Sequence, residues 1–225
     1  SEYTNATSTQ LVSPVHKQWD RELMGMLGYP ETMFLPLQMP GTLVGNLRPE
    51  IREKVGFDCQ VVLCASHDTA SAVMAMPAVE GEGCYISSGT LSLMGTELPG
   101  AVCTEKSRRE NFTSEGGYDF RFRYLKNIMG LWMIQSVRHE EKDRYSFARL
   151  CQMAEECKDF PSRVDVNDAV FLAPASMTEA IREYCQRTGQ QVPAAVGEIA
   201  AVIYQSLARS YGETVKELEK ITGRQ

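Results

Sequence analysis

Residues 61–75, VVLCASHDTASAVMA, constrain the fold most strongly, because a short apolar run passes directly into polar residues and then into small helix-forming residues. The run at 61–64 predicts a short strand buried on both faces. The alanine-rich part predicts a helix that any of the polar residues at 66–69 could cap. Ligands of open α/β sheets bind beyond the carboxyl ends of strands. Asp68 is therefore either a helix cap or an acid that meets a substrate.

Two later segments carry groups suited to binding phosphate and sugar. Residues 85–95, YISSGTLSLMG, predict two short strands around a Ser-Gly-Thr turn at 88–90, where the glycine permits close backbone approach and the threonine offers a hydroxyl. Turns with exposed backbone amides bind anions. Residues 121–135, RFRYLKNIMGLWMIQ, predict an alternating basic strand followed by an apolar helix, with Asn127 near the start of the helix and Gln135 two turns later.

Five short runs resemble the rhamnulokinase branch of the FGGY family of carbohydrate kinases, in the expected order and over nearly the whole chain. They are YTNAT, ASHDTASAV, YISSGT, NFTSEGG and LKNIMGLW. The resemblance implies the α/β class, with the ribonuclease H-like (actin-like ATPase) fold of a two-domain sugar kinase. Residues 1–76 would then form the C-terminal part of the first domain and residues 77–225 an incomplete second domain, with a break at Pro77, Gly81 and Gly83.

The resemblance also implies residue roles. Asp68 would be the general base that takes the proton from the 1-hydroxyl of L-rhamnulose as this hydroxyl attacks the γ-phosphate of ATP. The implied sugar contacts are His67, Asp68, Thr69 and Asn127, and the implied ATP contacts are Gly89, Thr90 and Gln135. Mg²⁺ would accompany ATP, held largely by phosphates and water. Members of this branch commonly carry Trp where this chain has Leu91, which changes the packing beside the phosphate turn.

Two alternatives stay open. The chain could belong to another FGGY kinase, acting on xylulose, fuculose or glycerol, which shares the same motifs. However, the sequence SHDTASAV at 66–73 favours L-rhamnulose. A non-catalytic sugar-binding or scaffold module is the alternative from another class. The family's N-terminal phosphate-binding hairpin and its glycine-rich adenosine loop are both missing from the 225 residues. We therefore interpret the chain as an internal fragment and expect no ATP turnover from it alone.

Charge and cysteine usage exclude some classes of partner. A net charge of −6 disfavours general binding to nucleic acid or to acidic membranes, which needs a positive field. No apolar run reaches the roughly 18 residues of a transmembrane helix. The seven cysteines form no CxxC pair, which is typical of reduced thiols in a cytoplasmic enzyme, although Cys59 and Cys64 could approach each other.

The remaining sequence predicts further helices, strands and loops. The threonine-rich run at 1–12 suits a strand, and the polar run at 105–110 suits a solvated loop tip. Helices are predicted where apolar residues recur at helical spacing between turn residues. They lie at 19–27, 49–55, 146–157, 177–187 and 193–222, and a short strand is expected near 42–44. Exposed sheet edges and the apolar stripe of the last helix predict self-association.

Overall fold

The computed structural model describes residues 1–77 and 83–223, and its contacts divide the chain into two compact units. The first unit joins the described residues of Ser1–Tyr85 to Gly95–Leu125, and the second joins Ile86–Met94 to the described residues of Lys126–Gln225. Part of the break predicted at Pro77, Gly81 and Gly83 lies outside the described residues, because Gly81 is not among them. The boundary at 76/77 therefore stays a prediction.

A four-stranded sheet has the strand order β3-β4-β6-β5. Its strands are β3 (Cys84–Ser88), β4 (Leu91–Leu98), β5 (Phe112–Gly116) and β6 (Phe122–Met129). As predicted, β3 and β4 are neighbours joined by the turn at 88–90, in which the amide of Gly89 donates to the carbonyl of Leu91 at 3.1 Å. Gly95 is required on β4, since a Cβ there would clash with the backbone of β6 at Tyr124 and Leu125.

The first unit contains short helices and a two-stranded ribbon besides its part of the sheet. These elements are α1 (Tyr3–Thr7), α2 (Arg21–Met26), η1 (Glu31–Met33), β1 (Leu43–Asn46), α3 (Pro49–Val55), β2 (Gln60–Val62), α4 (Asp68–Met74), α5 (Glu105–Arg109) and η2 (Tyr118–Phe120). The predicted helices at 19–27 and 49–55 are confirmed as α2 and α3, and the strand expected near 42–44 is confirmed as β1.

The predicted strand at the N-terminus is wrong, because this segment forms helix α1. The Glu2 side chain caps the helix by accepting hydrogen bonds from the amides of Thr4 and Asn5. A capped first turn outweighs the weak strand preference of threonine. α1 packs against β5 so closely that a Cβ at Gly116 would clash with the side chains of Tyr3 and Thr7.

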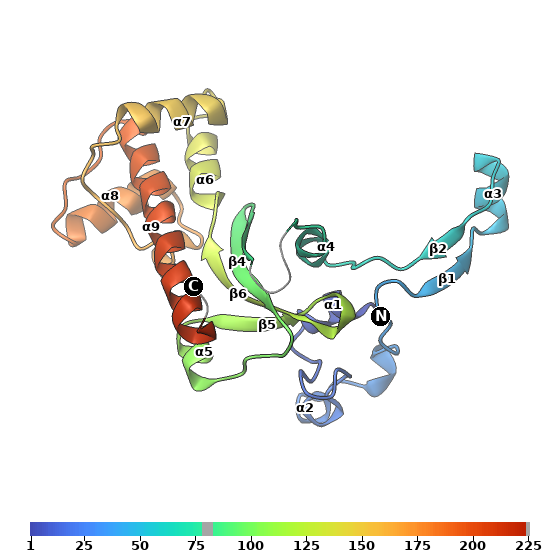
Figure 1. Cartoon of the computed structure of the whole chain (residues 1–225). Coiled ribbons are helices and arrows are strands. Elements are labelled where there is room, and N and C mark those ends of the chain that lie inside the picture. Colours follow the sequence, from blue (N-terminus) through green and yellow to red (C-terminus); the bar gives the residue numbers. More distant parts are fainter. Residues whose placement is uncertain (78–82, 224–225) are drawn as a thin grey trace. The chain divides into compact units, whose positions relative to one another are not determined.

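Strand β2 is also not the buried strand that its apolar residues predict. It pairs antiparallel with β1, with Leu43 opposite Val62, and α3 lies at the end of this ribbon (Figure 1). Val62 is 54% exposed, because the described residues of the chain place no layer over the ribbon. We call residues 43–62 the β1–β2 arm.

The polar run at 105–110 forms helix α5 and not a loop tip. Thr104 caps it, with its hydroxyl accepting from the amide of Ser107. Ser107 is buried, and its hydroxyl is 2.8 Å from the hydroxyl of Tyr124. The inward-facing Ser107 of this helix thus provides the buried Tyr124 hydroxyl with a hydrogen-bond partner.

The second unit is helical apart from its strand segments. Its helices are α6 (Trp132–Glu140), α7 (Phe147–Glu156), η3 (Ala169–Phe171), α8 (Met177–Arg187) and α9 (Val196–Thr222). The three predicted C-terminal helices are confirmed as α7, α8 and α9, and α9 ends at Gly223 in the left-handed conformation. However, the side chains of Phe147 and Cys151 on α7 are exposed, although its pattern predicts them to face inward.

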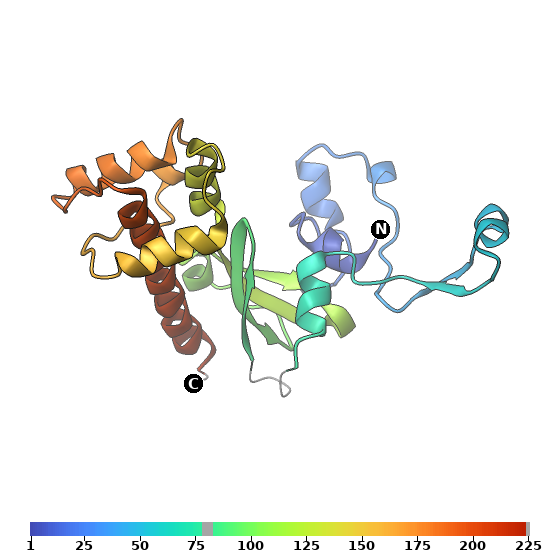
Figure 2. The same ribbon diagram turned by 90° about the horizontal axis from the view of Figure 1, so that it is seen from above.

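Two predictions about this unit need correction. The helix after β6 begins at Trp132, so Asn127 lies on strand β6, exposed, and not at a helix start. The apolar stripe of α9 is not unpaired, because α7 packs against it, as Figures 1 and 2 both show. Ile199, Ile203 and Leu207 are fully or almost fully buried there.

In the described part of the chain, no helix is both long enough and apolar enough to cross a membrane.

Candidate functional site

Asp68 is the first residue of α4, and its carboxylate points away from the protein. The side chain is 98% exposed, and its Oδ1 accepts from the amide and the hydroxyl of the next residue, Thr69, at 2.5 and 3.2 Å. The N-cap position belongs to His67, whose side chain makes no capping bond. Asp68 is therefore not the helix cap, and its carboxylate is accessible to a substrate.

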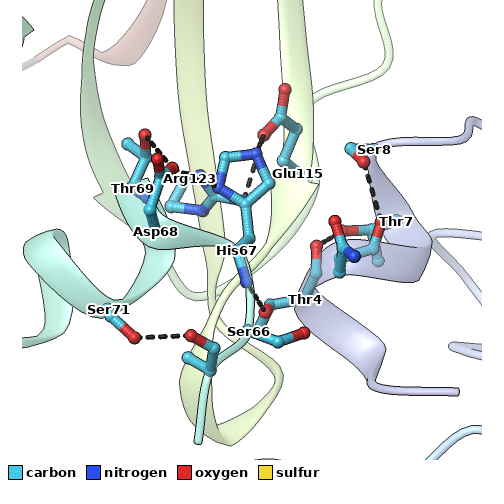
Figure 3. A network of polar contacts seen from close by, with 12 residues as sticks. Thr4, Thr7, Ser8, Ser66, His67, Asp68, Thr69, Ser71, Glu115 and Arg123 are labelled. Carbon is cyan, nitrogen blue, oxygen red and sulfur yellow. Dashed lines mark hydrogen bonds and ion pairs between the residues drawn. The ribbon is translucent and has the colours of Figure 1, made fainter.

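Helix α1 fixes one side of the loop that carries Asp68. Both the amide and the hydroxyl of Ser66 donate to Glu2 Oε2, at 3.1 and 2.7 Å. The amide of His67 donates to the hydroxyl of Thr4 at 3.3 Å (Figure 3). Burial tends to raise the pKa of Glu2, but hydrogen bonds from Thr4, Ser66 and Asn5 outweigh it and hold this pKa below its ordinary value. One ionised carboxylate thus caps α1 and anchors the loop.

The sheet fixes the other side through two charged residues that contact His67. Arg123 on β6 is 1% exposed, and its Nη2 lies 3.0 Å from Oε2 of Glu115 on β5. The His67 ring lies between these groups, with Nδ1 3.5 Å from Arg123 Nη1 and Nε2 3.8 Å from Glu115 Oε2 (Figure 3). His67 Nδ1 is also 3.5 Å from Asp68 Oδ1.

The charge environment of His67 favours a neutral ring. Burial is the largest cause that lowers the pKa of His67 below its ordinary value, and the positive charge of Arg123 lowers it further. The carboxylates of Glu115, Asp68 and Glu2 act in the opposite direction but do not reverse the shift. His67 is thus a neutral hydrogen-bonding group at neutral pH.

In the second unit, the predicted nucleotide residues lie together. The hydroxyl of Thr90 is 3.4 Å from Oε1 of Gln135 on α6, and the carbonyls of Gly89 and Thr90 accept from the amides of Leu131 and Trp132, both at 2.9 Å. A Cβ at Gly130 would clash with the Gly89 carbonyl and the backbone around residue 91. The turn at 88–90 is therefore packed against the start of α6.

The predicted residues thus form two groups, one in each unit. The first unit holds His67, Asp68 and Thr69, and the second holds Gly89, Thr90 and Gln135, together with Asn127, which lies apart on β6. Across residues 1–77 and 83–223, no three His, Cys, Asp or Glu side chains are grouped so that they could hold a metal ion.

Sequence reasoning missed Glu2, Glu115 and Arg123. The run NFTSEGG drew attention to its glycines, although Glu115 is the residue that reaches His67. Arg123 was one of the basic residues of an alternating strand, but all four residues of 122–125 are buried. A single charge within a buried apolar run was the available signal, because such a charge needs a partner.

Comparison with known proteins gives consistent matches. The model of the N-terminal domain of the FGGY family of carbohydrate kinases matches residues 1–75, and that of the C-terminal domain matches residues 84–225. Proteins named rhamnulokinase from Halalkalibacterium halodurans and Oceanobacillus iheyensis are 49% and 48% identical over 221 residues. That alignment covers 98% of this chain and 47% of each relative, so the chain spans about half the length of the curated relatives it matches.

Solved structures give the same fold at low identity. A ligand-bound xylulose kinase from Lactobacillus acidophilus matches with a TM-score of 0.61 at 14% identity, over 92% of this chain and 42% of that one. A xylulose kinase from Rhodospirillum rubrum matches with a TM-score of 0.60 at 12% identity, over the same shares of the two chains.

Proposed function

Because the chain belongs to the FGGY family of carbohydrate kinases, we propose that it is part of an ATP-dependent kinase that phosphorylates the 1-hydroxyl of L-rhamnulose. Family membership confirms the α/β fold class expected from the sequence. The choice of L-rhamnulose is supported by the relatives named rhamnulokinase, which are far more similar to this chain than the xylulose kinases of known structure. The product would be L-rhamnulose 1-phosphate.

Asp68 is the proposed general base. Phosphoryl transfer needs substrates held in line, stabilised phosphoryl oxygens and removal of a proton from the attacking hydroxyl. The observation that carries this assignment is the exposed Asp68 carboxylate, in a loop fixed by Glu2 on one side and by Arg123 and Glu115 on the other. A fixed and accessible acid can accept the proton from the 1-hydroxyl as this oxygen attacks the γ-phosphate.

The other predicted residues are proposed to hold the two substrates. His67 and Thr69, on either side of Asp68, would contact the sugar, and the exposed Asn127 on β6 would be a further sugar contact. Gly89, Thr90 and Gln135 would contact ATP, supported by the contacts that join the turn to α6. Backbone amides and a hydroxyl at a tight turn suit phosphate oxygens.

Mg²⁺ is expected with ATP, where it neutralises charge on the phosphates. Since the described residues form no cluster of metal ligands, we assign no residue of this chain to the ion.

We also propose that residues 1–76 belong to the first kinase domain and 77–225 to the second, supported by the separate family matches at 1–75 and 84–225. A cytoplasmic location is proposed because all seven cysteines are free thiols.

The test is Asp68→Asn in a kinase of the family's full length that contains this chain. We expect kcat to fall about 10²- to 10⁴-fold, because a positioned base contributes that much, while calorimetry still detects sugar binding. Asp20→Asn is the matched control, since Asp20 caps α2 through the amide of Leu23 and should leave kcat unchanged. A near-normal kcat for Asp68→Asn would show that Asp68 is not the base.

A panel of acceptors tests the substrate. L-rhamnulose should give the highest kcat/KM among L-rhamnulose, xylulose, fuculose and glycerol, measured with the same full-length enzyme. A higher value for another sugar would move the chain to another branch of the family. Binding of L-rhamnulose without phosphorylation of any of the four would favour a non-catalytic module.

A further inference from the structure

Arg123 is the largest fully buried side chain among the described residues, and its position needs a reason. A buried charge is costly unless it is paired. Its Nη2 pairs with Glu115, but within the part of the chain that the structure describes, neither Arg123 Nε nor the buried hydroxyl of Tyr85 has a hydrogen-bond partner. A purely structural role would be served better by an apolar residue of similar size. Besides Glu115, the guanidinium contacts the Gly116 carbonyl through Nη2 at 3.5 Å and the His67 ring through Nη1, and only the contact with His67 reaches the residue next to Asp68.

The contact with Arg123 bears on which of the two ring nitrogens of His67 carries the proton. A guanidinium nitrogen can only donate, so the Nδ1 atom that faces Arg123 Nη1 at 3.5 Å accepts from it only in the tautomer whose Nδ1 carries no proton. The single proton of a neutral ring then lies on Nε2, which faces the carboxylate of Glu115 at 3.8 Å. At these distances the contacts are mainly electrostatic, and both charges favour the same tautomer.

Asp68 competes with Arg123 for the same nitrogen. Its Oδ1 is 3.5 Å from His67 Nδ1, and a proton on Nδ1 would be shared with this carboxylate. However, the Asp68 side chain is 98% exposed and screened by water, whereas Arg123 is buried and acts at low dielectric. The charged groups facing His67 are Arg123 from β6, Glu115 from β5, Asp68 from α4 and Glu2 at the start of α1.

We propose that Arg123 and Glu115 are positioning residues for His67: the buried Arg123 keeps the ring neutral, so that no imidazolium neutralises the adjacent Asp68 carboxylate, and Glu115 holds the single ring proton on Nε2. The catalytic consequence rests on the proposed role of Asp68 as the base. Asp68 stays a free proton acceptor for the sugar hydroxyl, while His67 keeps a fixed orientation beside the sugar. A protonated His67 would instead donate to Asp68 and weaken it as a base.

Nuclear magnetic resonance of the histidine ring nitrogens tests the proposal directly. The full-length kinase is labelled with ¹⁵N in its histidine rings, and His67→Gln assigns the signal. We expect the wild-type ring to carry its proton on Nε2 and to titrate below the ordinary value of 6.5. A wild-type ring with its proton on Nδ1, or one that titrates above 6.5, would overturn the proposal without any variant.

Two variants should shift the His67 pKa in opposite directions. Arg123→Gln removes the positive charge and should raise the pKa of His67 and move its proton toward Nδ1. Glu115→Gln removes a negative charge and should lower this pKa further. Shifts in the same direction, or no shift, would contradict the proposal. Should Arg123→Gln fail to fold, the wild-type tautomer and the Glu115→Gln shift decide the question.

A second ion pair of the same sheet is the matched control. Glu97 on β4 and Arg121, the residue directly before β6, are 2.6 Å apart, and neither is among the charges that shift the pKa of His67. Arg121→Gln should leave the His67 signal unchanged. A shift equal to that of Arg123→Gln would mean that any loss of charge from the sheet disturbs the ring.

The kinetic readout separates this proposal from the proposed function. In Arg123→Gln, the fall of kcat on the acid side should begin at a higher pH than in the wild type, because His67 becomes protonated earlier. An unchanged acid limb would contradict the link to catalysis. If Asp68→Asn kept a normal kcat, the proposed base would be wrong, but the tautomer measured by resonance would still stand or fall on its own.

Discussion

The β1–β2 arm and helix α9 are both rich in apolar residues, but these residues are exposed on the arm and buried on α9. On the arm, Val44 and Phe57 are 65% and 59% exposed, whereas Ile203 on α9 is completely buried against the core that α6, α7 and α8 complete. The sequence pattern alone predicted the reverse, a buried strand at 61–64 and an unpaired stripe on the last helix. An apolar pattern shows that a surface can be covered, and only the fold shows whether this chain covers it.

The difference has an energetic meaning. Burial of apolar surface is the main favourable contribution to folding, so α9 should contribute much to stability and the arm little. Exposed apolar surface on a two-stranded ribbon instead favours association with another surface. Self-association thus remains a prediction, but its expected location moves from α9 to the arm.

The largest expected effect is on stability in the α9 core. Ile203→Ala should lower the free energy of unfolding of the second unit by about 2–5 kcal/mol, because it removes a buried side chain and leaves a cavity. Val44→Ala on the arm should change stability by no more than about 0.5 kcal/mol. The chain has two tryptophans, one in each unit, and unfolding in urea can be followed by their fluorescence. In a Trp19→Phe background the fluorescence of Trp132 reports the second unit alone. In a Trp132→Phe background the fluorescence of Trp19 reports the first unit alone. Equal losses at both sites would contradict the comparison.

The second prediction concerns pH and the first unit. Since burial and Arg123 lower the pKa of His67, the folded unit keeps the ring neutral at a pH where the unfolded chain binds a proton. The free energy of unfolding should therefore fall as the pH drops through 6.5 and level off below the folded pKa. Glu2, whose pKa is also lowered, adds a further loss as the pH falls below its ordinary value of 4.5. His67→Gln should flatten the first of these losses in the Trp19 signal, and an unchanged pH dependence would contradict the assignment.

The smallest effect on stability is expected on the arm itself. Leu43 and Val62 lie opposite each other, and replacing both with threonine keeps the strand preference while it reduces apolar surface. Light scattering should show less self-association, with stability unchanged within about 0.5 kcal/mol. Leu172→Thr is the control, because Leu172 is similarly exposed but lies in the second unit. A larger effect from Leu172→Thr would place the associating surface elsewhere.

Parts of the candidate site could be predicted because their chemistry is local. Asp68 was expected at the start of a helix, and the residues that follow do form α4. The turn at 88–90 was expected from its glycine and threonine, and it lies beside Gln135 as the proposed nucleotide group requires. Asn127 was placed on a helix because its apolar neighbours repeat at a spacing that fits either element, whereas sheet pairing with β4 and β5 holds it on β6.

The sequence by itself determined the positions of helices α2, α3, α4, α7, α8 and α9 and the family resemblance, because capping, turn chemistry and apolar periodicity act between residues a few positions apart. The tertiary structure alone decided which apolar surfaces are covered and which charges meet. Glu2, at the start of α1, and Glu115 and Arg123, on β5 and β6, are all far from His67 in the sequence, and their effect on His67 depends on separations of a few ångströms that only folding sets. Electrostatic interactions depend on the distance between charges and on their burial, and neither quantity can be obtained from the sequence alone.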